Sequence, residues 1–187
     1  MKHIYSFCGR KKELNEIRES LKKGNHVLIS GSYGMGKTRL ALESVRDFSP
    51  VVQRLSLNDP PATLKRKLFR HERLYPTRDV RRFVILDDIV RMSHQKSEFL
   101  RFLADRGYVF IAIEENGIPV KEHERLRYSS VPHIQLPLSY LSKNDTYEFL
   151  ETLNERLVLG KEKEQLVSLA KILKGHPLSL IQTIKEL

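Results

Sequence analysis

One short stretch limits what this chain can fold into more than any other. It reads Gly31-Ser32-Tyr33-Gly34-Met35-Gly36-Lys37-Thr38 and fits G-x-x-x-x-G-K-[ST], the pattern of a phosphate-binding P-loop. Residues 26–30 before it form an apolar run, and residues 37–47 after it carry apolar side chains at helical spacing. Because a P-loop works between a strand and a helix, we predict a nucleotide-binding loop here and not a glycine-rich hairpin.

The residue types of the motif suit phosphate chemistry. Glycines let the backbone turn tightly and bring its N–H groups close to phosphate oxygens, and the helix that follows directs its positive end at the same anion. Lys37 is expected to reach the outer phosphates, and Thr38 to place its hydroxyl on Mg²⁺. We expect ATP or ADP with Mg²⁺ as ligands. The candidate contact residues are Gly31, Ser32, Tyr33, Gly34, Met35, Gly36, Lys37, Thr38 and Arg39.

A second informative stretch, residues 82–88, has four apolar residues that end in two adjacent carboxylates, Asp87 and Asp88. This is the form of a Walker B strand, and a continuous apolar run is typical of a central parallel strand. The carboxyl end of such a strand lies at the edge of the sheet where ligands bind. We assign Asp87 to Mg²⁺ and Asp88 to the attacking water, beside Lys37 as the catalytic cation.

The bulk properties exclude several classes of protein. The chain has 187 residues and a single cysteine, Cys8, which rules out an intramolecular disulfide framework. Its apolar runs are too short to span a bilayer and its start has no signal core, so we expect a cytoplasmic protein without a membrane partner.

Positive charge is unevenly distributed along the chain. The net charge is +10, yet residues 138–187 contain seven basic and seven acidic side chains, so the excess lies in residues 1–137. Residues 62–82 hold eight basic side chains against Glu72 and Asp79. Such a basic face suggests nucleic acid. A solvated helix face near an ATP site gives the same pattern, and both interpretations stay open.

Alternating strand and helix patterns predict the fold. Strands are expected near residues 26–30, 51–57, 82–88, 108–113 and 133–136, with helices between them, which favours a parallel α/β sheet. The helix after Pro61 is predicted to turn Leu64, Leu68 and Phe69 inward. From residue 138 only helical patterns follow, the last starting at Pro177. We therefore predict a five-stranded parallel sheet flanked by helices over residues 1–137, and a small C-terminal helical lid over residues 138–187.

Taken together, these landmarks resemble the AAA+ superfamily of P-loop (ASCE) ATPases, and within it the STAND signal-transduction ATPases and their archaeal-type relatives. The P-loop and residues 83–88 match the family's Walker A and Walker B motifs. Three further motifs resemble family motifs: Phe7-x-Gly9-Arg10-x-x-Glu13-Leu14, Leu136-Pro137-Leu138-Ser139 and Gly175-His176-Pro177-Leu178-Ser179-Leu180.

The resemblance implies roles for several residues. Phe7, Gly9 and Arg10 would lie near the adenine, and Pro177 would pack on the base from the lid. The rigid apolar face of a proline suits that contact. His176 either points at the phosphates or is only part of the motif without a role of its own, and we favour the second interpretation.

The position after the fourth strand departs from the family. Where the family often has a polar or basic sensor, this chain has Glu114-Glu115, and we include Glu114 among the candidate catalytic residues. Carboxylates repel a γ-phosphate unless a cation lies between them, so we expect slow hydrolysis. If the fourth strand ends later than residue 113, Asn116 takes the sensor position instead of the glutamates. No arginine finger can be assigned among Arg106, Arg125 and Arg127.

The sequence therefore predicts a nucleotide-dependent switch domain that hydrolyses ATP slowly with Mg²⁺, and that works with a homo-oligomer or a protein partner. Two rival interpretations remain. One is a DNA-associated AAA+ ATPase of the initiator or loader kind, and the other is a degenerate domain that binds ADP as a scaffold.

Overall fold

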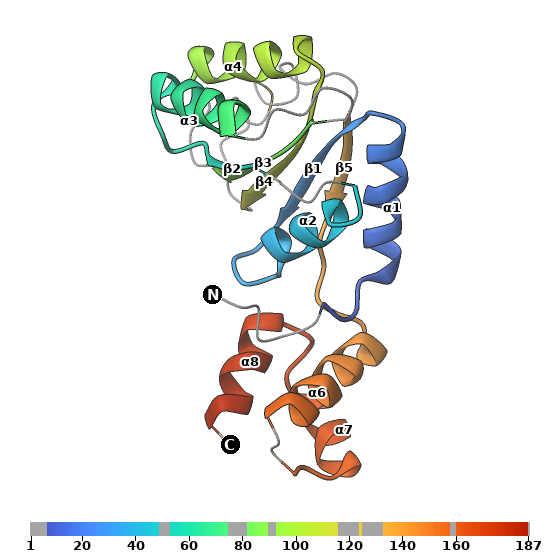
Figure 1. Ribbon diagram of the computed structural model, residues 1–187. Coiled ribbons are helices and arrows are strands. Elements are labelled where there is room, and N and C mark those ends of the chain that lie inside the picture. The colour runs from blue at the N-terminus through green and yellow to red at the C-terminus, as the bar shows by residue number, and fades with distance from the viewer. Residues whose placement is uncertain are drawn as a thin grey trace.

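The computed structural model describes residues 7–48, 53–74, 82–89, 93–115, 124, 133–157 and 160–186. Within them, one sheet of five strands has the order β2-β3-β4-β1-β5, and all neighbouring strands are parallel (Figure 1). This confirms the predicted α/β P-loop NTPase architecture. The strands are β1 (His26–Gly31), β2 (Gln53–Ser56), β3 (Arg82–Ile89), β4 (Tyr108–Glu115) and β5 (His133–Pro137).

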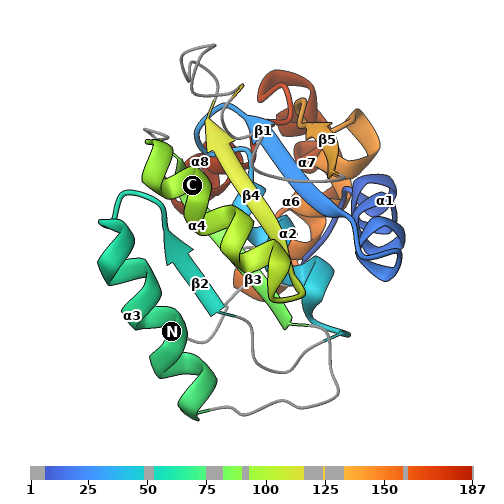
Figure 2. The same cartoon turned by 90° about the horizontal axis from the view of Figure 1, so that it is seen from above.

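Helices cover both faces of the sheet (Figures 1 and 2). The helices α1 (Lys11–Lys22) and α2 (Lys37–Val45) pack on one face, where Ile17, Leu21 and Leu40 are fully buried against strand residues. The helices α3 (Pro61–Leu74) and α4 (His94–Asp105) cover the other face. Because both faces are covered, β4 is buried from Tyr108 to Glu114, which explains the continuous apolar runs in the sequence.

The helix α4 begins at His94, where Ser93 caps it by accepting a hydrogen bond from the Lys96 N–H. Two local expectations need correction. The strand β4 extends to Glu115, two residues beyond the predicted end. Phe69 was predicted to face inward but is 44% exposed. It lies about 100° around α3 from Leu68, and its ring packs edge-on against Phe102 instead of entering the core.

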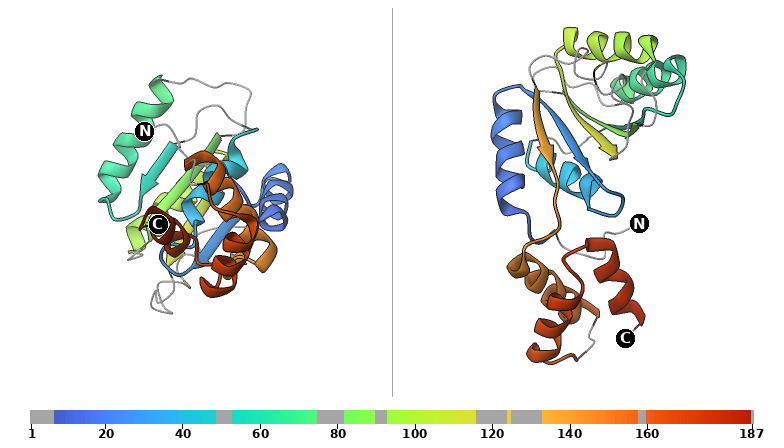
Figure 3. Two further views of the ribbon diagram at one scale, coloured as in Figure 1. Left: turned by 90° about the horizontal axis from the view of Figure 1, so that it is seen from below. Right: turned by 180° about the vertical axis from the view of Figure 1, so that it is seen from behind.

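The segment after β5, which we call the lid (residues 138–186), contains α6 (Lys143–Leu157), α7 (Lys163–Ile172) and α8 (Pro177–Glu186) (Figure 3). The lid has an apolar core of its own, separate from those of the sheet. Ser142 caps α6 by accepting a hydrogen bond from the Asp145 N–H at 3.1 Å. None of the helices within the described ranges is long and apolar enough to cross a membrane.

Gly175 fixes the path of the chain into α8. Its backbone has φ +72°, and its carbonyl accepts a hydrogen bond from the Leu141 N–H at 2.9 Å. A Cβ at this position would lie 2.3 Å from the Leu141 carbonyl oxygen. The entry to α8 therefore packs against the entry to α6 too closely for any side chain.

We predict that Gly175→Ala destabilises the protein more than Gly107→Ala. Gly107 has a similar φ of +76° but has nothing within 4 Å of an added Cβ, so it isolates the conformational effect. We expect a loss of about 1 kcal/mol at Gly107 and about 3 kcal/mol at Gly175, where a clash is added. Urea denaturation measures both losses. Equal losses would contradict the close packing of Gly175.

Candidate functional site

A cavity of about 640 Å³ lies between the carboxyl edge of the sheet and the lid. The P-loop, α2, β2, β3 and β4 line it from the core, and α6 and α8 line it from the lid. We call it the interdomain cavity. Among the predicted site residues, its walls include Phe7, Arg10, Tyr33, Gly34, Met35, Gly36, Lys37, Thr38, Arg39, Asp87 and Pro177. Gly9, Gly31 and Ser32 were also predicted to contact nucleotide but are not among its walls.

The P-loop residues adopt the geometry that the motif predicts. The strand β1 pairs with β4 and β5 and ends at Gly31, and α2 begins at Lys37 with Gly36 as its N-cap. Gly36 offers no side-chain cap, so the first N–H groups of α2 are left for another acceptor. An anion at this helix end would meet those N–H groups and the positive end of the helix dipole.

Lys37 is buried and bends back over the loop. Its Nζ donates to the carbonyls of Gly31 at 2.7 Å and Ser32 at 2.8 Å. Burial lowers the pKa of Lys37, and the carboxylates of Glu115 and Asp87 oppose that change. Carbonyl oxygens thus hold the ammonium at the cavity wall, where phosphate oxygens would be stronger partners.

Thr38 and Asp87 meet on the wall of the cavity. The Thr38 hydroxyl donates to Asp87 Oδ2 at 3.0 Å, and Asp87 is buried. The register of β3 against β4 shifts between Leu86 and Ile89, next to Asp87.

This pair of oxygens fits Mg²⁺. Mg²⁺ in nucleotide sites takes one or two protein oxygens and completes its shell with phosphate and water. No group of three His, Cys, Asp or Glu side chains that could hold a metal by itself occurs in the described residues. The backbone of Asp88 belongs to β3, but its side chain lies outside the description, so its assignment to the water stays a prediction.

Arg54 is a cavity residue that the sequence analysis missed. It extends from β2, and its NH2 lies 2.5 Å from Asp87 Oδ2. Asn58, just beyond β2, also lines the cavity. The only signal in the sequence was that Arg54 is a basic residue near the end of the second strand. It lies two positions before Ser56, and Ser56 pairs in register with Asp87.

The structure corrects the choice between the two glutamates after the fourth strand. Glu115 lines the cavity, whereas Glu114 is buried and is not among the walls. Successive side chains of a strand point to opposite faces, and Glu115 shares its face with Ile113, which lines the same cavity. The structure thus brings Glu115, and not the predicted Glu114, to the cavity wall, and a catalytic role for either glutamate stays a prediction. Asn116, the alternative sensor, lies outside the described residues.

Apolar side chains line part of the cavity and suit a base. Phe7 and Pro177, which the resemblance places near the adenine, are among them, and their contact with a base stays a prediction. Sequence reasoning missed the other apolar walls, which the lid contributes: Leu141, Phe149, Leu178 and Ile181. Gly9 faces the lid, where an added Cβ would be 3.1 Å from Asp145 Cβ.

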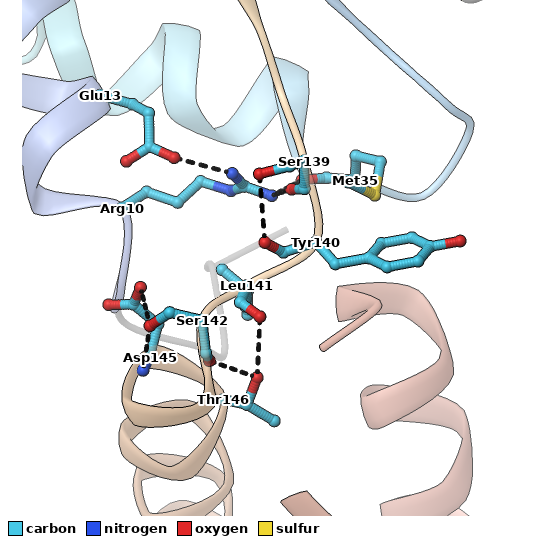
Figure 4. A network of polar contacts seen from close by, with 9 residues as sticks. All are labelled: Arg10, Glu13, Met35, Ser139, Tyr140, Leu141, Ser142, Asp145 and Thr146. Atoms are coloured by element: carbon cyan, nitrogen blue, oxygen red, sulfur yellow. Dashed lines mark hydrogen bonds and ion pairs between the residues drawn. The ribbon is translucent and has the colours of Figure 1, made fainter. Parts of the chain in front are cut away.

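Arg10 joins the core to the lid (Figure 4). Its buried guanidinium donates to the carbonyl oxygens of Ser139 at 2.7 Å and Met35 at 3.3 Å, and it pairs with Glu13 at 3.1 Å. Its backbone is left-handed, with φ 53°, a conformation that surrounding contacts must stabilise. Arg10 borders the cavity as predicted, but its polar atoms bind the P-loop and the linker to the lid.

His176 was expected to be part of its motif without a role of its own, and that expectation is wrong. Its Nε2 lies 3.0 Å from the Tyr33 carbonyl oxygen, and its Nδ1 lies 3.3 Å from the Ser179 backbone nitrogen. A carbonyl only accepts and a backbone N–H only donates, so the ring carries its proton on Nε2. Gly34 makes room for this contact, since an added Cβ would be 2.7 Å from His176 Cε1.

Arg106 does not reach the interdomain cavity of its own chain. It caps α4 just before β4, at the opposite edge of the sheet, where it lies 3.7 Å from Glu72. Tyr108 donates to the same carboxylate, and burial together with this bond raises the pKa of Tyr108 to about 12. Arg125 and Arg127 lie outside the described residues.

We predict that His176→Ala loosens the lid from the P-loop. Losing the bond to Tyr33 should cost about 1 kcal/mol and speed hydrogen exchange of the amides in α8 and the P-loop. His94→Ala is the matched control, because His94 is an exposed histidine on α4. Hydrogen exchange with mass spectrometry measures the effect. Unchanged exchange in both segments would show that the contact does not hold the lid.

No protein-family model matches the chain. Over 42 residues it is 50% identical to uncharacterised proteins of Mycobacterium tuberculosis and Mycobacterium bovis, a match that covers 22% of this chain and 11% of each of those proteins.

Solved structures of RuvB from Thermotoga maritima share the fold. The RuvB Holliday junction branch migration motor superposes with a TM-score of 0.69 at 20% identity, over 96% of this chain and 61% of RuvB. A point mutant of the same RuvB gives 0.73 at 15% identity, over 98% of this chain and 65% of that chain. The chain thus spans less than two thirds of the RuvB structures, and the likeness establishes the fold.

Proposed function

We propose that this chain is an ATP-binding switch domain of the AAA+ type that hydrolyses ATP slowly with Mg²⁺. The observation that carries the proposal is that Lys37, Thr38 and Asp87 line one cavity together with apolar side chains. Such a cavity is complementary to a nucleotide, with charged groups for phosphates and apolar walls for the base. The STAND subtype is supported by the motif at Gly175–Leu180, whose proline lines the cavity.

In the proposed mechanism, water attacks the γ-phosphate in line with the leaving oxygen. The Lys37 ammonium and the N–H groups at the start of α2 stabilise the charge that develops on the phosphate oxygens. Thr38 and Asp87 are the residues that would hold Mg²⁺, which supplies further charge neutralisation when bound. Asp88 orients the water. Glu115 places a carboxylate on the cavity wall, and this unfavourable charge supports slow turnover.

The lid would couple nucleotide state to shape. Pro177, Leu178 and Ile181 would contact the base, while His176 holds the P-loop carbonyl of Tyr33. A nucleotide between these groups would contact the lid and the P-loop at once. Its binding would therefore favour the arrangement in which the lid lies on the core over arrangements in which the two are apart. A partner that recognises the closed arrangement would then detect the bound nucleotide.

Steady-state ATP turnover tests the proposal. We expect Mg²⁺-dependent hydrolysis by the wild type, a loss of about a hundredfold in Lys37→Ala, and a comparable loss in Asp88→Asn. Lys171→Ala and Asp59→Asn are matched controls, since neither residue lines the cavity. If the wild type hydrolyses no ATP and ADP co-purifies with it, the proposal of an ATPase is contradicted. The alternative of a domain that binds ADP as a scaffold would then remain.

A second function, DNA association, has separate support. The exposed side of α3 carries Lys65, Arg66, Lys67, Arg70 and Arg73, and its one carboxylate, Glu72, turns away to pair with Arg82 at 2.9 Å. The charged side chains on the exposed face of this helix are therefore all basic, and Phe69 and Leu74 are exposed beside them. The RuvB neighbours, a branch migration motor, share the fold, and duplex DNA is the polyanion that a basic helix face would meet in such a protein.

We predict that, if this second function holds, the double variant Arg66→Gln/Arg70→Gln weakens duplex DNA binding and makes it less sensitive to salt. Removing two phosphate contacts should reduce the slope of log K against log salt by about 2. Lys163→Gln/Lys171→Gln, two exposed lysines of α7, is the control of equal charge. Fluorescence anisotropy over a NaCl series measures the slope. Equal binding by both double variants would contradict a role for α3.

A further inference from the structure

The ion pair between Arg54 and Asp87 occupies the place where Mg²⁺ is expected. Asp87 Oδ2 accepts from the Thr38 hydroxyl at 3.0 Å and from the Arg54 guanidinium at 2.5 Å. Thr38 and Asp87 are the two residues whose oxygens fit the metal. Arg54 therefore acts as a cation on the same carboxylate oxygen that the metal needs.

Burial explains why the carboxylate requires a cation when no metal is bound. Asp87 is only 5% exposed, and a buried carboxylate is costly unless it is paired and hydrogen-bonded. Lys37 is near, but its ammonium bonds to the P-loop carbonyls of Gly31 and Ser32. The guanidinium of Arg54 provides a direct charge-assisted hydrogen bond to Asp87.

The position of Arg54 allows its side chain to move away from Asp87. It projects from β2, the edge strand of the sheet, and its side chain is 52% exposed. A guanidinium and a divalent cation on one carboxylate oxygen repel each other strongly at such short distance. A half-exposed side chain on an edge strand can rotate toward solvent, whereas Asp87, buried inside the cavity, cannot.

We propose that Arg54 is the counter-ion that Mg²⁺ must displace from Asp87, and that this competition sets the Mg²⁺ concentration at which the site fills. The inference rests on the proposed function, since it requires a nucleotide site that takes Mg²⁺. It makes Arg54 a positioning residue, which keeps Asp87 paired and aimed at Thr38 until the metal arrives.

The test is the Mg²⁺ dependence of nucleotide binding, which does not rely on turnover. The fluorescence of mant-ADP is followed over a buffered series of free Mg²⁺ for the wild type, Arg54→Gln and Arg54→Lys. Arg101→Gln removes an equal charge from an exposed, carboxylate-paired arginine of α4, outside the cavity, and is the matched control. We expect the Mg²⁺ midpoint to fall about tenfold in Arg54→Gln, equivalent to about 1.4 kcal/mol, and by less in Arg54→Lys, which keeps the charge but loses the planar fork.

A second measurement guards against a folding defect. In EDTA, Arg54→Gln should melt at a lower temperature than the wild type, because Asp87 loses its charge-assisted hydrogen bond from Arg54. Mg²⁺ with ADP should narrow this difference in melting temperature. If both Arg54 variants bind mant-ADP with an unchanged or higher Mg²⁺ midpoint, the inference about Arg54 is overturned while the proposed function stands. If mant-ADP binds neither the wild type nor the variants, the proposed function falls and this inference with it.

Discussion

Parallel pairing of β1 with β4 on one side and β5 on the other is the constraint on which the rest of the structure depends. In a parallel sheet all strands end at the same edge, so the register places Gly31 opposite Glu115 and Ser30 opposite Pro137. The pairing of β3 with β4 and β2 brings Asp87 and Arg54 to that edge. Residues far apart in the sequence thus gather around one cavity because backbone hydrogen bonds fix where each strand stops.

The lid depends on a few close contacts with this edge. Arg10 binds the P-loop and the linker, and His176 binds the carbonyl of Tyr33. Gly34 allows the P-loop to approach His176 and Leu178 of the lid more closely than any side chain would permit. The P-loop is therefore held from both sides, by strand pairing below and by polar contacts from the lid above, and a ligand that moves either body must change these contacts.

The sequence was sufficient to predict the sheet, its flanking helices and the P-loop, because periodicity and glycine spacing are local signals. It also identified Thr38 and Asp87, which the structure brings to 3.0 Å from each other. It failed where the answer depends on a strand's exact end or on tertiary contact. Glu114 was chosen over Glu115 because a shift of one residue reverses the face of a strand, and no local signal distinguishes the two.

Arg54 and His176 illustrate the second kind of failure. Neither belongs to a motif that assigns it a partner, and their partners lie 33 and 143 residues away. Phe149 and Ile181 likewise lie in segments for which the sequence predicts only helices, and helical periodicity does not show which side chains face a cavity. Such roles follow from how the lid sits on the core, and that arrangement is set by contacts of long sequence separation.

The central claim is that the interdomain cavity binds a nucleotide with its base toward the lid. Photolabelling with 8-azido-ATP, followed by mass spectrometry of the peptides, tests this claim most directly. The account predicts adducts within the segment that includes Phe7 and Cys8 or within the first turns of α8, suppressed by excess ATP. Labelling elsewhere on the chain, or labelling that ATP does not suppress, would contradict it.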